Sequence, residues 1–201
     1  MLLRLLACFA VGSVPFAVIA MAGSGINIRQ IGSGNPGFNN VLRVSKPRAL
    51  VALIGDMGKG YLALWLVLKV WPVAGPWPGA IGWAWLCGFA AVLGHCFSPL
   101  LGFNGGKGVA TSGGVMLVLY PRWALLALAY FAAIRLTAGK LAWREAGALA
   151  SLTTWALFAV LLLGFAGRAD AACAALMTLF LCWRHHRNFQ NLMAARREAA
   201  R

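Results

Sequence analysis

The chain has 201 residues, of which 61% are hydrophobic and 11% are charged, and its formal net charge is +14. Soluble domains carry roughly 25% charged residues, so this composition excludes an ordinary soluble enzyme and indicates an integral membrane protein. Apolar segments run from one end of the chain to the other, so we expect one domain over residues 1–201 without a soluble lobe.

Membrane helices are predicted at seven apolar stretches. They are, in chain order, Leu5–Ala22, Leu50–Val70, Ala80–Leu93, Val109–Tyr120, Trp123–Leu136, Gly147–Gly164 and Ala171–Trp183. A bilayer crossing needs about 20 residues, so whether Val109–Tyr120 and Ala171–Trp183 cross fully stays open. The first stretch has 18 uncharged residues, which is too long for the apolar part of a signal peptide. We therefore expect an all-α, polytopic membrane helical bundle of about seven transmembrane helices.

The distribution of Lys and Arg orients this bundle. With seven crossings and the N-terminus outside, 13 of the 18 basic residues fall in cytoplasmic segments and the C-terminus is cytoplasmic, as the positive-inside rule requires. Trp71 and Trp77, in a proline-rich stretch, then mark an outer interfacial turn. This topology and the attraction of anionic lipid headgroups account for the net charge. No nucleic-acid partner is expected.

The five cysteines are scattered through apolar segments without the spacing of a metal site or a disulfide framework. We read them as small buried apolar residues. No metal and no other cofactor is predicted.

The first polar cytoplasmic segment is 32-GSGNPGFNNVLR-43. Its glycines permit positive φ angles and close approach of the backbone to a ligand, and its polar side chains add hydrogen-bond donors and a guanidinium group. The residues concerned are Gly32, Ser33, Gly34, Asn35, Gly37, Asn39, Asn40 and Arg43. This chemistry suits an oxyanion, and a flexible loop of turn-forming residues is the alternative.

The second polar segment is 94-GHCFSPLLGFNGGKGVAT-111. Gly105, Gly106 and Gly108 place backbone N–H groups directly before a helix that we expect to begin near Val109. A helix start attracts anions, and Lys107 adds a full positive charge. The segment is not a nucleotide-hydrolysing P-loop, because Leu101 and Gly108 replace the required Gly and Ser/Thr.

Two further polar elements lie near apolar spans. The element Asp56-Met-Gly-Lys-Gly60 is similar to Asn104-Gly-Gly-Lys-Gly108, either as an internal repeat or by chance. Asp56 and Lys59 are three residues apart, so we expect them to pair on one helix face. The third polar segment, 183-WRHHRNFQNL-192, places His185, His186 and Asn188 just after the last span, as site residues or as solvated ones.

Together these elements resemble the motif set of a known family. The elements are Gly32-Ser-Gly-Asn-Pro-Gly with Asn40 and Arg43, Asp56-x-x-Lys59-Gly60, Gly94-His95 followed by Gly-Gly-Lys-Gly-Val-Ala-Thr111, and His185-x-x-Asn188. In order and spacing, along nearly the whole chain, they resemble the bacterial membrane acyl-phosphate:glycerol-3-phosphate acyltransferases, the PlsY-type family.

The resemblance implies a seven-helix, multi-pass enzyme of the bacterial cytoplasmic (inner) membrane with its active site at the cytoplasmic face. It would move a fatty acyl group from acyl phosphate to sn-glycerol 3-phosphate, giving lysophosphatidic acid and phosphate, in the first step of phospholipid biosynthesis. Its partners would be these two substrates and membrane lipids. The catalytic residues implied are Ser33, Lys107, His185 and Asn188. The substrate-binding residues implied are Gly34, Asn35, Gly37, Asn40, Arg43, Lys59, His95, Asn104, Gly105, Gly106, Gly108 and Thr111.

The residues themselves favour catalysis by positioning. The acids number four, Asp56, Glu145, Asp170 and Glu198, and no Ser-His-Asp arrangement is indicated. An acyl phosphate is already activated, so the protein would chiefly orient it and neutralise its charge. We expect a substrate phosphate to take the hydroxyl proton, with His185 or His95 as the competing base.

Departures from the family pattern fall inside the motifs. Phe38-Asn39 replaces the usual Ala-Thr, and Asn104 and Asn191 replace a usual Lys and Arg, so two cations would be missing from the phosphate pocket. A diverged relative with another phosphate-bearing acceptor, or without activity, is therefore an alternative. A transporter or lipid-binding protein is less favoured, because the charges gather at one face. The acyl-chain preference and the oligomeric state stay open.

Overall fold

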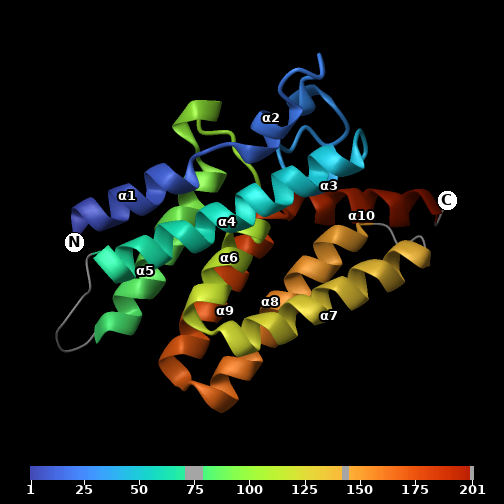
Figure 1. Cartoon of the computed structure of the whole chain (residues 1–201). Helices are drawn as coiled ribbons and strands as arrows, with labels where there is room; N and C mark the ends of the chain where they lie inside the picture. The colour runs from blue at the N-terminus through green and yellow to red at the C-terminus, as the bar shows by residue number, and fades with distance from the viewer. Residues whose placement is uncertain (71–78, 142–144, 200–201) are drawn as a thin grey trace. The chain divides into compact units, whose positions relative to one another are not determined.

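The structure is a computed structural model that describes residues 1–70, 79–141 and 145–199. Every regular element in these ranges is a helix, which confirms the all-α prediction (Figure 1). The chain divides into two compact units, unit 1 from Met1 to Pro121 and unit 2 from Arg122 to Arg201. Whether it acts as a single domain stays a prediction. The expected outer turn with Trp71 and Trp77 lies outside the described residues.

The helices follow the apolar stretches of the sequence, with additions. Those of unit 1 are α1 (Leu2–Gly12), α2 (Phe16–Met21), η1 (Ile28–Gln30), α3 (Phe38–Val41), α4 (Lys46–Val70), α5 (Gly79–Cys96), η2 (Pro99–Leu101) and α6 (Val109–Leu119). They are followed by α7 (Pro121–Lys140), α8 (Ala146–Phe165), α9 (Arg168–Arg184) and α10 (His186–Ala199).

The first apolar stretch is not one continuous helix, contrary to the expectation for Leu5–Ala22. Helix α1 ends at Gly12 and α2 begins at Phe16. Pro15 explains the break, because proline has no amide hydrogen and its ring clashes with the carbonyl four residues earlier. The two pieces together, Leu2–Met21, are still long and apolar enough to cross a membrane.

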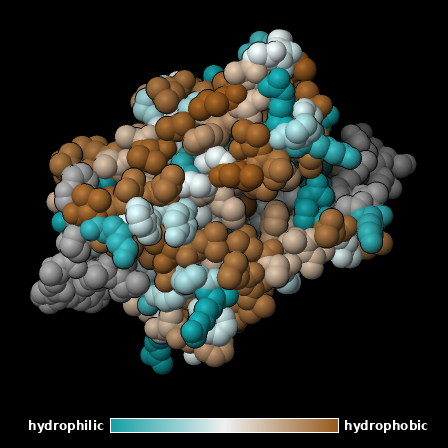
Figure 2. Space-filling view, in the orientation of Figure 1, coloured by the Kyte–Doolittle hydropathy of each residue, from teal (hydrophilic) through white to brown (hydrophobic). Residues whose placement is uncertain are grey.

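Four segments of the described chain are long and apolar enough to cross a membrane: Leu2–Met21, Lys46–Val70, Gly82–Leu101 and Ala146–Phe165. In helix α4 the apolar residues Leu50, Ile54 and Leu62 are exposed, while the charged residues Asp56 and Lys59 are buried. Figure 2 shows hydrophobic residues over much of the visible surface. Exposed apolar area of this extent indicates contact with lipid.

Glycines let the helices of unit 1 pack at close range. Helix α4 packs against α6, and α1 against α5. A Cβ atom added to Gly60 would lie 2.1 Å from the carbonyl oxygen of Thr111, and one added to Gly114 would lie 2.0 Å from that of Met57. The backbones of α4 and α6 are therefore in direct contact, as is common where small residues line helix interfaces in membranes.

Unit 2 has its own apolar core between α8 and α9. Trp155 and Phe158 make an edge-to-face contact with ring centroids 5.4 Å apart, and Phe158, Met177 and Leu181 are fully buried. Residues 186–199, for which no helix is predicted, form α10. This segment lacks Gly and Pro and is rich in Ala, Arg and other good helix formers.

Candidate active site

Asn40 organises the first polar segment. Its side chain is buried, and its amide nitrogen donates to the carbonyl oxygens of Ile28, at 2.9 Å, and Ile31, at 2.8 Å. Its amide oxygen accepts a hydrogen bond from the backbone N–H of Ser33 at 3.4 Å. All three contacts are with backbone atoms of residues 28–33, so in this structure Asn40 holds the start of the segment that carries Ser33. Its assignment to direct substrate binding stays a prediction.

The Arg43 side chain lies close to the start of this segment, next to Ser33. Gly32 has a φ angle of +54°, and a Cβ atom there would lie 2.6 Å from Nη1 of Arg43. The guanidinium group is thus packed beside the residue that precedes Ser33, and both Ser33 and Arg43 are exposed.

Gly34, with a φ angle of +68°, closes a turn by donating its backbone N–H to the carbonyl oxygen of Ile31. Asn35 donates its backbone N–H to the Ser33 hydroxyl at 3.4 Å, and Gly37 precedes the short helix α3.

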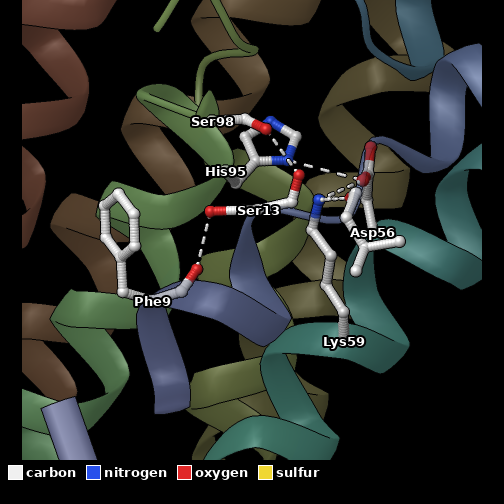
Figure 3. A network of polar contacts seen from close by, with 7 residues as sticks. Phe9, Ser13, Asp56, Lys59, His95 and Ser98 are labelled. Atoms are coloured by element: carbon white, nitrogen blue, oxygen red, sulfur yellow. Dashed lines mark hydrogen bonds and ion pairs between the residues drawn. The ribbon is translucent and has the colours of Figure 1, made fainter. Parts of the chain in front are cut away.

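Lys59 and His95 converge on Asp56 in the interior of unit 1 (Figure 3). Lys59 Nζ lies 2.8 Å and His95 Nδ1 3.4 Å from Asp56 Oδ1. The predicted pairing of Asp56 with Lys59 is confirmed. Lys59 and His95 are 3% and 7% exposed, so direct contact of either with a substrate stays a prediction.

The same cluster serves the break in the first apolar stretch. Lys59 Nζ donates to the carbonyl oxygen of Val14 at 2.6 Å, and Ser98 Oγ donates to that of Ser13 at 2.6 Å. A broken helix leaves carbonyls without helical partners, and in a membrane each such group costs several kcal/mol. Helix α4, through Lys59, and the residue before η2, Ser98, thus supply hydrogen-bond donors to the carbonyls at the break.

The glycine loop, residues 105–108, differs from the expectation. The sequence predicts that the N–H groups of Gly105 and Gly106 bind an anion. In the structure they donate instead to the carbonyl oxygens of Cys96, at 3.1 Å, and His95, at 3.2 Å. The cause is the end of α5, where the last carbonyls have no intrahelical partner. The loop returns beside this helix end and supplies the missing donors. These two amides therefore hold the loop in place.

The start of α6 keeps the features of an anion site. Gly108 precedes the helix with a φ angle of +90°, and no side chain among the described residues caps it. Lys107 is half-buried immediately before it, whereas Asn104 is exposed. Thr111 is fully buried in the first turn, and its hydroxyl has no hydrogen-bond partner among the described residues. A buried hydroxyl without a partner calls for an explanation, and a bound ligand would supply one.

In unit 2, His185 lies between α9 and α10. The imidazole is buried, and its Nδ1 atom is 2.8 Å from the carbonyl oxygen of Leu181. When Nδ1 donates to that carbonyl, Nε2 is the ring nitrogen that accepts a proton. Asn188 is half-buried in the first turn of α10. His185 and Asn188, the predicted site residues of the third polar segment, are therefore positioned by the junction of α9 and α10.

The partner of Asn188, which is not predicted from the sequence, is Glu145. The Asn188 amide donates to Oε2 of Glu145, and the Asn191 amide donates to Oε1 at 3.2 Å. The signal available in the sequence was the rarity of acids, four in the chain, together with the position of Glu145 directly before an apolar span. Asn191, which we expected to mark a missing phosphate-binding cation, faces a carboxylate.

The predicted site residues fall into the two units. The first and second polar segments belong to unit 1, and the third belongs to unit 2. Within unit 1 the structure links His95 to Gly106 of the glycine loop. Within unit 2 it links Asn188 to Glu145. Convergence of all three segments on shared phosphate groups stays a prediction.

Known proteins resemble the chain along almost its whole length. Residues 2–195 match the family model described as glycerol-3-phosphate acyltransferase. A protein of that name from Aromatoleum aromaticum is 41% identical over 194 residues, covering 96% of this chain and 92% of the relative. Its counterpart from Burkholderia pseudomallei is 38% identical over 195 residues, with coverage of 96% and 92%.

Solved structures give the same result. The crystal structure of PlsY (YgiH), an integral membrane glycerol 3-phosphate acyltransferase, in its glycerol 3-phosphate form, matches with a TM-score of 0.80 and 27% identity, covering 97% of this chain and 92% of that one. The lysophosphatidic acid form matches with a TM-score of 0.78 and 26% identity, with the same coverage.

Proposed function

The chain belongs to the glycerol-3-phosphate acyltransferase family, and from this premise we propose that it transfers a fatty acyl group from acyl phosphate to sn-glycerol 3-phosphate. The products are lysophosphatidic acid and inorganic phosphate, and the reaction is the first step of phospholipid biosynthesis. The enzyme acts in the cytoplasmic (inner) membrane of a bacterium as a multi-pass protein. It has seven crossings, its N-terminus outside and its active site at the cytoplasmic face.

The start of α6 is the observation that carries this proposal. Lys107 supplies a cation there, the first turn of the helix supplies N–H groups without intrahelical partners, and Thr111 supplies a buried hydroxyl. These groups suit the phosphate of glycerol 3-phosphate. Since the Gly105 and Gly106 amides are used within the protein, their role is to hold this phosphate site at the end of α5.

The transfer needs little covalent chemistry from the protein. The glycerol 3-phosphate hydroxyl oxygen attacks the acyl carbonyl carbon, the bond between that carbon and the phosphate oxygen breaks, and phosphate leaves with the electron pair. Cations near both phosphates lower the cost of the developing charge. Ser33 and Arg43, adjacent in the first loop, orient the acyl phosphate. The hydroxyl proton passes to a substrate phosphate oxygen, whose second pKa lies near 6.

His185 is the competing proton acceptor, because its Nδ1 contact with Leu181 leaves Nε2 as the basic nitrogen. His95 is a weaker competitor, since its Nδ1 atom faces Asp56 in the interior. Asn188 is oriented by Glu145 beside His185. The acyl chain lies between helices and reaches lipid sideways, as the exposed apolar side chains of the spans allow.

The test is turnover by the purified protein with palmitoyl phosphate and glycerol 3-phosphate, without ATP or coenzyme A thioester. We expect lysophosphatidic acid and phosphate in equal amounts. Lys107→Met is expected to lower kcat/KM for glycerol 3-phosphate at least about 100-fold, because one preorganised charge at such a site contributes on that scale. Lys46→Met, at the exposed start of α4, is the matched control and should leave turnover unchanged.

Three outcomes oppose the proposal. No product, together with tight binding of another organic phosphate, would identify a diverged family member with a different acceptor. Flux of radiolabelled glycerol 3-phosphate into vesicles without product would identify a transporter. Equal losses in Lys107→Met and Lys46→Met would show that α6 does not carry the phosphate site.

A further inference from the structure

Asp56 is the centre of a buried polar cluster that the proposed chemistry does not use. The residue is 1% exposed. Its Oδ1 atom contacts Nζ of Lys59, from the same helix, and Nδ1 of His95, from the end of α5 (Figure 3). A charged group at this depth in a membrane protein is expensive and marks a function. Lys59 balances the carboxylate charge and donates to Val14 at the helix break, so the contact with His95 is the one whose role has not been assigned.

His95 connects this cluster to the glycine loop in two ways. Its carbonyl oxygen accepts the N–H of Gly106 at 3.2 Å. Its imidazole ring also lies directly against Gly106, because a Cβ atom there would be 2.1 Å from Nε2 and 2.9 Å from Cε1. The residue before it on the loop, Gly105, is held by the neighbouring carbonyl of Cys96 at 3.1 Å. The loop thus rests on both the backbone and the ring of His95.

We propose that Asp56 is a positioning residue: its carboxylate fixes the His95 ring, and through that ring it sets the place of the glycine loop, Lys107 and the start of α6. A carboxylate at Nδ1 selects the tautomer with the proton on that nitrogen and fixes the plane of the ring. The fixed ring then packs directly against the backbone of Gly106, because glycine has no side chain to separate the two. Lys59 and His95, assigned above to substrate binding by resemblance, act in this scheme from inside the protein.

A purely structural role makes a different prediction, and the cluster itself contains the control. Ser98 is as buried as Asp56 and donates to the Ser13 carbonyl at the same helix break. Its side chain thus supports the break, as Lys59 does through Val14. If Asp56 only supports this break, Ser98→Ala will reproduce its loss.

The experiment compares Asp56→Asn, the charge-balanced double variant Asp56→Asn/Lys59→Gln and Ser98→Ala in the full-length protein. The double variant avoids an unpaired buried lysine, which would compromise folding. Deuterium exchange of a peptide covering residues 103–109 reports directly on the Gly105 and Gly106 hydrogen bonds. We expect exchange there to accelerate about 10-fold in the Asp56 variants, with little change in Ser98→Ala.

The kinetic arm rests on the proposed function. We expect KM for glycerol 3-phosphate to rise about 10-fold in the Asp56 variants while KM for palmitoyl phosphate stays constant, since one phosphate site loosens and the other does not. His95→Ala should show the same rise, and adding the Asp56 substitution to it should raise KM no further, because Asp56 acts through His95.

Each result decides the inference. Unchanged exchange in residues 103–109, or equal acceleration there and in α4, would overturn it, as would Ser98→Ala matching the Asp56 variants. A wild-type protein without turnover would sink the proposed function, and the exchange measurement would still decide the role of Asp56. Additive KM effects of Asp56 and His95 would show that Asp56 does not act through the ring.

Discussion

Glu145 illustrates how a single side chain sets the geometry of the third polar segment. It precedes α8 in a left-handed conformation with a φ angle of +57°, which is uncommon for a residue with a side chain. Its carboxylate accepts from two amides of α10, those of Asn188 and Asn191. Hydrogen bonds to a charged acceptor are roughly twice as strong as neutral ones. Asn188 is thereby fixed relative to His185, which precedes it by less than one helical turn.

Removing this carboxylate should therefore lower activity without unfolding the protein. We expect Glu145→Ala to reduce kcat about 10-fold or more, because a misplacement of about 1 Å in a catalytic group has effects of this size. Asn191→Ala removes only the outer contact and should change kcat less than about 3-fold, since exposed polar contacts contribute little. Steady-state phosphate release measures both. Equal kcat values for Glu145→Ala and wild type would mean that Asn188 needs no partner.

At the residue scale, the sequence predicts contacts that are close along the chain and misses those that are not. Asp56 and Lys59 are three apart on one helix, so their pairing follows from helical geometry. Glu145 is 43 residues from Asn188 and 46 from Asn191, and no local rule connects them. The hydrogen bonds of Gly105 and Gly106 were missed for the same reason, because they depend on where α5 ends.

Among the elements, α4 carries two glycines on different faces, and only Gly60 lies at its crossing with α6. Gly60 faces the backbone of α6, where an added Cβ atom would lie 2.1 Å from the Thr111 carbonyl oxygen. Gly58, two residues earlier, has no atom within 4 Å of such a Cβ atom. The same chemical change therefore has opposite consequences at the two positions. Backbone atoms cannot move aside as a flexible side chain can, so α6 itself would have to shift.

Gly60→Ala should destabilise the protein, and Gly58→Ala should not. Forcing a methyl group into a packed interface costs about 1–3 kcal/mol, which corresponds to a fall in Tm of about 5 °C. Gly58→Ala should raise stability by up to about 1 kcal/mol through better helix propensity. Thermal unfolding of the two variants in detergent, measured by tryptophan fluorescence, tests this. A higher Tm for Gly60→Ala than for Gly58→Ala would contradict the close crossing.

The elements were largely predictable, and their interruptions were less so. The helix expected near Val109 begins at that residue, because the preceding Gly108 adopts a positive φ angle that ends the loop. The break at Ser13–Pro15 was not predicted, because the span was identified from the length of its apolar stretch and the effect of Pro15 on the helix was not considered. Helix α10 was missed because it lacks the apolar periodicity used to find helices, and its composition was the only indication.

For the whole molecule, the number of crossings decides on which side of the membrane each terminus lies. Four described segments meet the length and apolarity of a span, and an even number would leave both termini on one side. Seven crossings need α6, α7 and α9 as well. Helix α7 has 20 residues and α9 has 17, which span roughly 25–30 Å and approach the hydrocarbon thickness. Helix α6, with 11 residues, rises roughly 16 Å and would need a locally thin membrane.

Cysteine labelling separates the two topologies because two positions change sides. With seven crossings and the N-terminus outside, Arg122→Cys faces the outside and Gln190→Cys the cytoplasm, whereas with the four spans alone the two are reversed. Gln30→Cys is cytoplasmic in both schemes. A membrane-impermeant maleimide should therefore label Arg122→Cys in intact spheroplasts, and the other two only after permeabilisation. The wild type, whose five cysteines are buried or half-buried, gives the background. Labelling of Gln190→Cys in intact spheroplasts, with Arg122→Cys protected, would place the third polar segment on the opposite side of the membrane from the first. The two segments could then not contribute to one active site, and the proposed site would be wrong.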